Sequence, residues 1–193
     1  RGGDLVIGTD GGSNGDSLDP ATYTATYAQV VGMQLYNNLI ELDEHNRPQP
    51  SLAVSWEAKP GATEWVIQLR KGVTFHNGKT MTAEDVVYSL NYHRSADSKS
   101  AAKAFLAPVK DIKATTPNEV TITLDGPNAD LPYLIADYHL CIGPDGVPFD
   151  KGIGTGAFVL KAFEPGVRTR TERYPNHWNP DRGHVDEVNF KCI

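Results

Sequence analysis

The clearest alternation of apolar and polar positions begins a third of the way along the chain. Trp65, Ile67 and Leu69 occupy every second position, a period that predicts a strand with one buried face. Two dipeptides with turn chemistry follow, Lys71-Gly72 and Asn77-Gly78. Glycine adopts a positive φ without steric cost, and asparagine tolerates it better than most residues. The pattern therefore predicts a strand followed by two tight turns.

A helix is expected directly after these turns. Thr82 has a hydroxyl suited to an N-cap, and Asp85 stands three residues further on, where an acidic side chain can complete a capping box. Val86, Leu90 and His93 then recur at helical spacing. The carboxylate of Asp85 also lies in the first turn, where the helix dipole favours negative charge. Strand, turns and capped helix form a self-consistent unit that contains no catalytic constellation.

The same criteria predict strands and helices along the rest of the chain. Helices are expected over residues 26–39 and 131–136. Pro117-Asn118 and Pro165-Gly166 lie between alternating apolar runs and predict the turns of two hairpins. The expected strands are residues 4–9, 109–115, 119–124, 138–142, 157–163, 168–173 and 185–191. No internal repeat or low-complexity segment interrupts this mixed α/β pattern.

The composition is that of a globular protein. The 193 residues are 39% hydrophobic, and a chain of this length buries about 70% of its unfolded surface, which is enough for a stable core. A formal net charge of -6 argues against a nucleic-acid partner. No apolar run approaches the roughly 18 residues of a membrane span, and no signal peptide is present. Cys141 and Cys192 either form one disulfide or remain free thiols.

Catalytic and metal-binding patterns are missing from the sequence. It contains no Gly-x-Ser-x-Gly elbow, no phosphate-binding loop and no supported Cys/His pair. Asp16 and Asp19 lie close together in a turn-rich segment, where a carboxylate pair serves caps and turns more often than acid/base chemistry. The six histidines lack the spacing of convergent metal ligands, and His139 beside Asp137 is the one candidate. We therefore expect neither an enzyme nor a cofactor or metal centre.

Four segments, in this order along the chain, resemble one family of proteins. The most specific is residues 69–92, LRKGVTFHNGKTMTAEDVVYSLNY, which matches a strand end, a Gly-Val-x-Phe-His-x-Gly turn and a Thr-Ala-x-Asp-Val helix start. The others are SNGDSLDPATYT (13–24), LYNNLIELDEHNRPQPSLAVSWE (35–57) and GIGTGAFVLKAF (152–163). Together they are similar to the bacterial extracellular solute-binding proteins of family 5, the dipeptide-, oligopeptide- and nickel-type binding proteins of ABC importers. The resemblance covers nearly the whole chain.

The resemblance implies a lobe of the type II periplasmic binding protein fold, in which helices flank a mixed sheet. Residues 1–43 and 151–193 would form the discontinuous core of the first lobe, and residues 44–150 an inserted α+β subdomain. Prolines within residues 48–50 and 144–148 mark the two crossings. Family members have two lobes, and this chain stops directly after its last expected strand. The expectation is therefore an amino-terminal piece from which the second lobe is absent.

The resemblance also places the ligand between the lobes, against three loops of the first. These loops comprise residues 11–18, 137–139 and 154–156. Their hydroxyl and amide groups can hydrogen-bond a ligand, and their glycines let the backbone approach it closely. The competing interpretation is ordinary turn chemistry in the first loop and a hairpin entry in the last. The candidate ligand-binding residues are Ser13, Asn14, Asp137, Tyr138, His139, Gly154, Thr155 and Gly156.

The function implied by the resemblance is the capture of a solute for import. Such a protein binds a peptide or another small molecule, closes around it and delivers it to a membrane permease. It would work in the periplasm or another extracytoplasmic space, as a secreted or lipid-anchored monomer whose signal peptide has been removed. The cargo stays open between a peptide, a sugar, an opine and a metal chelate, and the isolated lobe is expected to bind weakly or not at all, because half of the cleft is missing. The alternative is a binding module of a peptide- or carbohydrate-processing enzyme.

Overall fold

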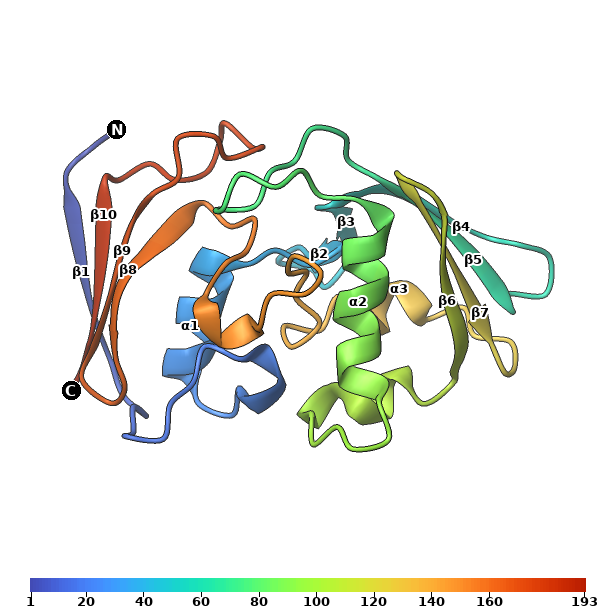
Figure 1. Cartoon of the computed structure of the whole chain (residues 1–193), viewed down its shortest axis with the longest axis horizontal. Coiled ribbons are helices and arrows are strands. Elements are labelled where there is room, and N and C mark those ends of the chain that lie inside the picture. The colour runs from blue at the N-terminus through green and yellow to red at the C-terminus, as the bar shows by residue number, and fades with distance from the viewer.

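Two four-stranded sheets stand at opposite ends of the molecule, with the helices between them (Figure 1). The computed structural model describes all 193 residues. Neighbouring strands of the first sheet are antiparallel, with one exception. The edge strand, which is the first strand of the chain, runs parallel to the last one. The first sheet consists, in spatial order, of β1 (Asp4–Thr9), β10 (Glu187–Cys192), β9 (Arg168–Arg173) and β8 (Phe158–Glu164).

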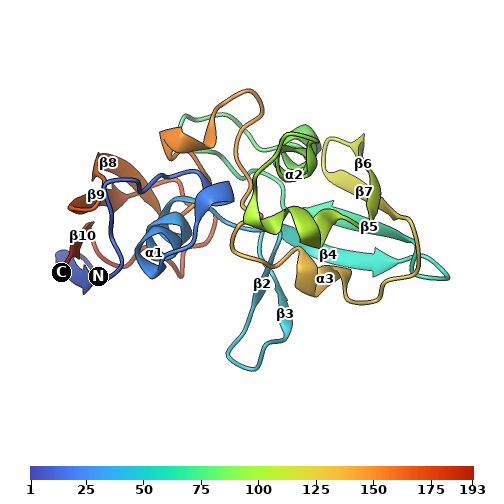
Figure 2. The same ribbon diagram turned by 90° about the horizontal axis from the view of Figure 1, so that it is seen from below.

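The second sheet is antiparallel throughout and lies in the middle of the sequence. It consists, in spatial order, of β4 (Ala53–Ala58), β5 (Glu64–Leu69), β7 (Glu119–Leu124) and β6 (Val109–Thr116). A short hairpin, formed by β2 (Ile40–Leu42) and β3 (Pro48–Pro50), projects from the side of the molecule (Figure 2). The first sheet thus joins strands from both ends of the chain, whereas the second is continuous in sequence.

Three α-helices and three short 3-10 helices complete the fold. The α-helices are α1 (Thr26–Leu35), α2 (Ala83–Arg94) and α3 (Leu131–Leu134), and the 3-10 helices are η1 (Pro20–Thr22), η2 (Ala101–Leu106) and η3 (Phe149–Lys151). Helix α1 packs against β8 of the first sheet, and α2 packs against β6 and β7 of the second. None of these helices has the length and apolar character that a membrane span requires.

Each sheet has its own hydrophobic core beneath its helix. The buried face of α1 contributes Tyr27, Val31 and Leu35 to the first core, where they meet Phe158 and Phe190 of the sheet. The second core contains the inward-facing side chains of β5 and β7 together with those of α2. Since apolar burial is the main driving force of folding, each sheet–helix pair is stabilised mainly by its own core.

Some residues of each predicted subdomain pack in the hydrophobic core of the other one. Leu39 and Ile40 belong to the core of the second sheet, whereas Cys141 and Phe149 belong to that of the first. The sheets follow the expected discontinuous arrangement, but their packing does not mark a boundary at residue 43 or 150. The division into residues 1–43 with 151–193 and residues 44–150 stays a prediction.

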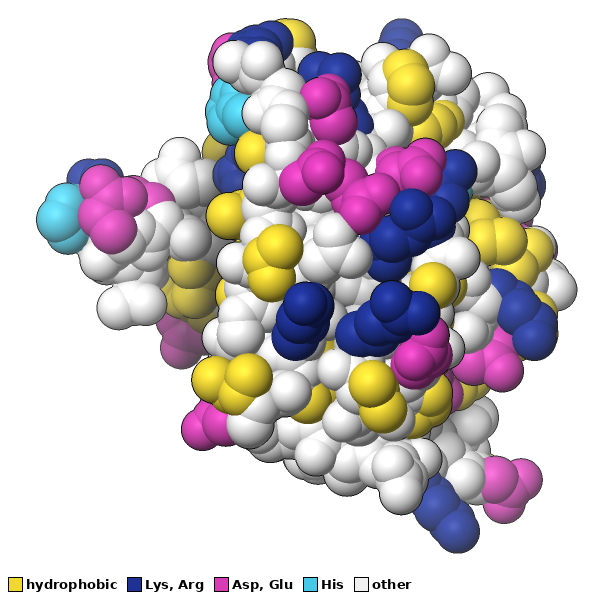
Figure 3. Space-filling view, turned by 90° about the vertical axis from the view of Figure 1, so that its left-hand side faces the viewer, with side chains coloured by type: hydrophobic (Ala, Val, Ile, Leu, Met, Phe, Trp, Pro, Cys, Tyr) yellow, Lys and Arg dark blue, Asp and Glu magenta, His cyan; other side chains and the backbone are white.

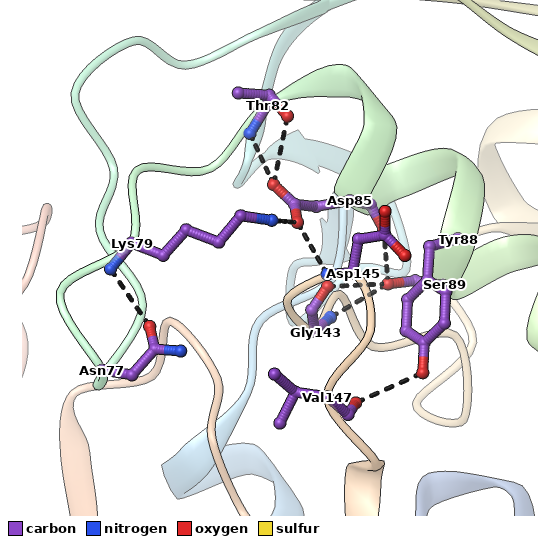
Figure 4. Close-up of polar contacts among 9 residues, drawn as sticks. All are labelled: Asn77, Lys79, Thr82, Asp85, Tyr88, Ser89, Gly143, Asp145 and Val147. Atoms are coloured by element: carbon purple, nitrogen blue, oxygen red, sulfur yellow. Dashed lines mark hydrogen bonds and ion pairs between the residues drawn. The ribbon is translucent and has the colours of Figure 1, made fainter.

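The capped helix predicted from the sequence is α2, and polar contacts join its start to the segment around residues 143–147 (Figure 4). Asp85 is fully buried and accepts hydrogen bonds from the backbone N–H groups of Thr82, at 2.8 Å, and of Asp145, at 2.7 Å. The ammonium group of Lys79 pairs with the same carboxylate. One turn later, the Ser89 hydroxyl donates to the Asp85 carbonyl and accepts from the N–H group of Gly143. Asp85 therefore caps its helix and fixes a distant loop at the same time.

The outward face of the first sheet is charged and faces the viewer in Figure 3. Arg170 pairs with Glu187 across β9 and β10 at 3.0 Å, and Lys161 pairs with Glu172 across β8 and β9 at 3.0 Å. These pairs are partly exposed, so each contributes at most about 1 kcal/mol to stability. Lysine and arginine side chains lie beside a group of acidic ones on this face, and the hydrophobic side chains there are scattered (Figure 3).

Most predicted strands agree with the structure to within two residues, but two local predictions were wrong and three strands were missed. Residues 138–142 form no strand, since the Asp137 carboxylate accepts from the His139 N–H and folds this segment into a turn. The helix predicted over residues 26–39 ends at Leu35, whose carbonyl accepts instead from the N–H group of Gly156. Met33, which belongs to the apolar spacing of that helix, is 67% exposed. Strands β2, β3 and β4 were not predicted at all.

Candidate functional site

A groove made of two adjoining hollows opens beside the end of α1. The larger hollow has a volume of about 530 Å³, and the smaller one, of about 200 Å³, shares with it Met33, Asn37, Glu41 and Arg182. Figure 2 shows the structural frame, with α1 on one side of β2 and α3 on the other. We call the two hollows together the Asn37 groove. Its size falls within the range of about 300–1,000 Å³ typical of small-molecule sites.

The rim of the larger hollow is apolar. Met33, Leu42 and Tyr133 are 67%, 42% and 48% exposed, and all three line this hollow. Large apolar side chains that gather around a concave surface, and are not merely scattered, indicate a place where another molecule is bound. Tyr138 lines the same hollow, and partial burial raises the pKa of its hydroxyl, so the phenol is neutral at physiological pH.

Two of the eight predicted site residues, Asp137 and Tyr138, line the groove. The third member of that loop, His139, is buried. Its Nδ1 lies 2.6 Å from the Asp137 carboxylate, and its Nε2 lies 2.8 Å from the backbone carbonyl of Tyr23. Both ring nitrogens of His139 are thus engaged in holding this loop against the segment that precedes α1.

The loop of Gly154, Thr155 and Gly156 lies directly behind the groove and is buried. A Cβ atom on Gly154 would lie 2.2 Å from the carbonyl oxygen of Leu35, and one on Gly156 would lie 2.2 Å from that of Gln34. Backbone atoms cannot yield at such distances, so both positions require glycine for close packing against the last turn of α1. The contact made possible here is with the helix, while Thr155 is fully buried.

His76 connects the family-like turn to this loop. Its Nε2 lies 2.9 Å from the Gly156 carbonyl, its Nδ1 lies 3.3 Å from the Gly154 nitrogen, and its own N–H donates to the Gly154 carbonyl at 2.9 Å. Burial lowers the pKa of His76, which favours the neutral ring. A neutral ring with its proton on Nε2 donates to the carbonyl and accepts from the amide, so it satisfies both contacts.

Asn37, which the sequence did not single out, links the loop to the groove. Its Oδ1 accepts from the Thr155 hydroxyl at 3.0 Å and from the Trp178 indole N–H at 3.1 Å. The Arg70 guanidinium lies over the face of the Trp178 ring, 4.5 Å from its centroid. The available sequence signal was the polar pair Asn37-Asn38 inside the apolar run from Leu35 to Ile40.

Ser13 and Asn14 lie away from the groove, beside the turn between β8 and β9. A Cβ atom on Gly166 of that turn would lie 2.7 Å from the carbonyl carbon of Ser13. The Ser13 N–H donates to the Asp16 carboxylate at 2.8 Å, which is the turn chemistry considered as the competing interpretation. The structure therefore does not bring the three predicted loops into a single hollow.

The remaining chemistry-bearing residues form no centre of their own. Cys141 and Cys192 are both free thiols, and burial raises the pKa of Cys141 far above its usual range. No group of three or more His, Cys, Asp or Glu side chains is gathered so that it could hold a metal ion.

Comparison with known proteins agrees with this fold. The family described as bacterial extracellular solute-binding proteins, family 5 Middle, matches residues 47–193. The Bacillus subtilis protein YhjP is 34% identical over 178 residues, which is 90% of this chain and 30% of YhjP. The periplasmic oligopeptide-binding protein OppA of Escherichia coli is 27% identical, over 94% of this chain and 38% of OppA.

A solved structure extends the comparison to the whole fold. The oligopeptide-binding protein AppA of Bacillus subtilis, in complex with a nonapeptide, superposes with a TM-score of 0.89 at 26% identity and covers 100% of this chain and 40% of AppA. The chain thus spans less than half the length of these relatives, and the type II periplasmic binding protein lobe expected from the sequence is confirmed. The chain belongs to the bacterial extracellular solute-binding proteins of family 5.

Proposed function

We propose that this chain takes part in capturing a peptide or another small solute outside the cytoplasm, for delivery to the permease of an ABC importer. Family membership supports this, as does the likeness to AppA, whose structure holds a nonapeptide. The observation that carries the proposal is the Asn37 groove, a concave surface with an apolar rim and polar groups on its wall. This combination is typical of small-molecule sites.

The mechanism is capture by differential affinity. A solute that contacts two surfaces binds more tightly when they are closed around it, and it shifts the population towards the closed form by that difference in affinity. The permease would then recognise the closed form. In this account Asp137 and Tyr138 contribute to the wall that the solute meets, whereas Gly154, Thr155 and Gly156 support that wall from behind.

The proposal is tested by a panel of solutes from the four classes that the sequence leaves open. Saturation-transfer NMR with the 193-residue chain would use trileucine, maltose, octopine and a nickel–histidine complex, each at millimolar concentration. We expect a saturation-transfer signal for trileucine, and we expect this signal to decrease when a second, competing peptide is added. If none of the four probes receives saturation above that of a non-binding reference such as sucrose, solute capture by this chain is refuted.

A further inference from the structure

The side chain of Asn37 stands where the two hollows of the groove meet. It lines both of them, directly after the last residue of α1. A group in this position contacts any molecule that extends from one hollow into the other. The orientation of its amide therefore matters for what the groove can bind.

The neighbours of Asn37 fix which end of the amide faces the protein. The indole N–H of Trp178 can only donate, so the atom 3.1 Å away must be the oxygen Oδ1 and cannot be the nitrogen. The Thr155 hydroxyl lies 3.0 Å from the same oxygen. Oδ1 is thus held by two donors from separate segments, and a flip of the amide would set its NH₂ group against the Trp178 N–H, which cannot accept.

The amide nitrogen of Asn37 has no hydrogen-bond partner within the chain. It is also not among the side-chain atoms that are sealed from solvent without a partner, which are Nε2 of His93 and of His177. Since Asn37 lines both hollows, its NH₂ group is open to the groove. An oriented donor that is already fixed costs less entropy on binding than a group that must first be ordered.

Two neighbouring polar groups on the groove wall are held by partners within the chain. The amide of Asn38 donates to the carbonyl of Asp137, and the Arg182 guanidinium pairs with the Glu41 carboxylate at 3.2 Å. The hydroxyls of Tyr133 and Tyr138 can turn to donate or accept. Asn37 differs from them in that its amide oxygen is held by two donors while its amide nitrogen has no partner in the chain.

Asn37 is also supported indirectly by His76, in the turn of residues 72–78. His76 hydrogen-bonds both Gly154 and Gly156, and the loop between them presents the hydroxyl of Thr155 to Asn37. His76 and Thr155 are thus positioning residues, because they contact the groove only through Asn37. A turn that looks purely structural in the sequence takes part in setting the chemistry of the site.

We propose that the Asn37 NH₂ group donates a hydrogen bond to a carbonyl or carboxylate oxygen of the solute, with the apolar part of the solute against Met33 and Tyr133. This inference rests on the proposed function and names the chemical group of the solute that the groove recognises. A neutral amide donor accepts either oxygen type, so both a peptide carbonyl and a terminal carboxylate fit.

The test follows the side-chain NH₂ resonances of Asn37 in ¹⁵N–¹H spectra of the 193-residue chain. Trileucine supplies both carbonyls and a carboxylate, and trileucinamide supplies carbonyls alone. We expect saturable shifts of the Asn37 NH₂ pair with both peptides if it meets a carbonyl, and with trileucine only if it meets the carboxylate. The Asn37→Asp variant, which keeps Oδ1 but loses the donor, should bind about tenfold more weakly.

Two controls separate the donor from charge and from packing. Asn77→Asp adds the same charge at an exposed turn, where the acceptor for the Lys79 N–H is kept, and should bind as the parent chain does. Thr155→Val removes one of the two donors to Oδ1 and should weaken binding, whereas Thr155→Ser should restore it. The spectra themselves show whether each variant is folded.

The outcomes distinguish this inference from the proposed function. If a peptide shifts resonances around the groove while the Asn37 NH₂ pair stays in place, or if Asn37→Asp binds like the parent chain, the donor role is overturned and solute binding stands. Equal weakening by Asn37→Asp and Asn77→Asp also overturns it, since charge would then be the cause. If neither peptide produces a saturable shift anywhere, the donor role toward a peptide fails, and the panel of four solutes decides whether solute capture stands.

Discussion

Replacing Asp85 by alanine should destabilise the chain far more than removing an exposed carboxylate from the same helix turn. The substitution leaves the N–H groups of Thr82 and Asp145 without their acceptor, and each buried donor left unpaired costs about 1–3 kcal/mol. Thr82 is half-buried and Asp145 is exposed, so water replaces part of the loss and the lower end of the range applies. The side chain of Lys79 is 41% exposed, so its ion pair adds little after solvent screening.

The expected loss is therefore about 2–3 kcal/mol in the free energy of unfolding, or about 5–10 °C in Tm for a chain of this length. Urea unfolding followed by circular dichroism measures it. Glu84→Ala is the matched control, because Glu84 is exposed in the same turn and only its interaction with the helix dipole is lost, about 0.3–1 kcal/mol. A loss for Asp85→Ala no larger than that for Glu84→Ala would show that the buried carboxylate does not join α2 to the loop at residues 143–147.

Three further predictions concern other buried groups. Burial lowers the pKa of His93 to about 4, so the unfolded chain takes up its proton first as pH falls from about 6.5. The free energy of unfolding should fall by up to about 3 kcal/mol between pH 6.5 and 4, and His93→Gln should flatten this slope in urea titrations. Gly156→Ala should lower Tm by several degrees, because its Cβ would meet a backbone carbonyl, whereas Gly126→Ala, with open space around it, should change little. Ellman's reagent should label only Cys192 in the native chain, and Cys141 as well after unfolding in guanidinium, because Cys141 is buried. Two labelled thiols in the native state would contradict that prediction.

The sequence predicted the elements in which local chemistry and tertiary packing agree. Trp65, Ile67 and Leu69 alternate in sequence and are buried in the sheet, and Asp85 forms the contact with Thr82 that its spacing indicated. The strand predicted for residues 138–142 was wrong. The apolar pattern there favours a strand, but the Asp137 carboxylate contacts the N–H group and the ring of His139 and holds the segment in a turn.

The groove was harder to predict because its key residue is defined by distant partners. Asn37 is held by Thr155 and Trp178, which follow it by 118 and 141 positions. No local pattern reveals such a pair of donors. The sequence predicted that the loop of residues 154–156 meets the ligand, whereas in the structure its two glycines pack closely against the last turn of α1.

The most direct test of solute capture at the groove uses the two methionines of the chain as paired probes. Met33 is 67% exposed on the groove rim, whereas Met81 is buried in the core of the second sheet. In a chain labelled with ¹³C at the methionine methyl groups, titration with trileucine should shift the Met33 signal in a saturable manner and leave the Met81 signal in place. A Met33 signal that stays unmoved while other resonances report peptide binding would contradict capture at this groove.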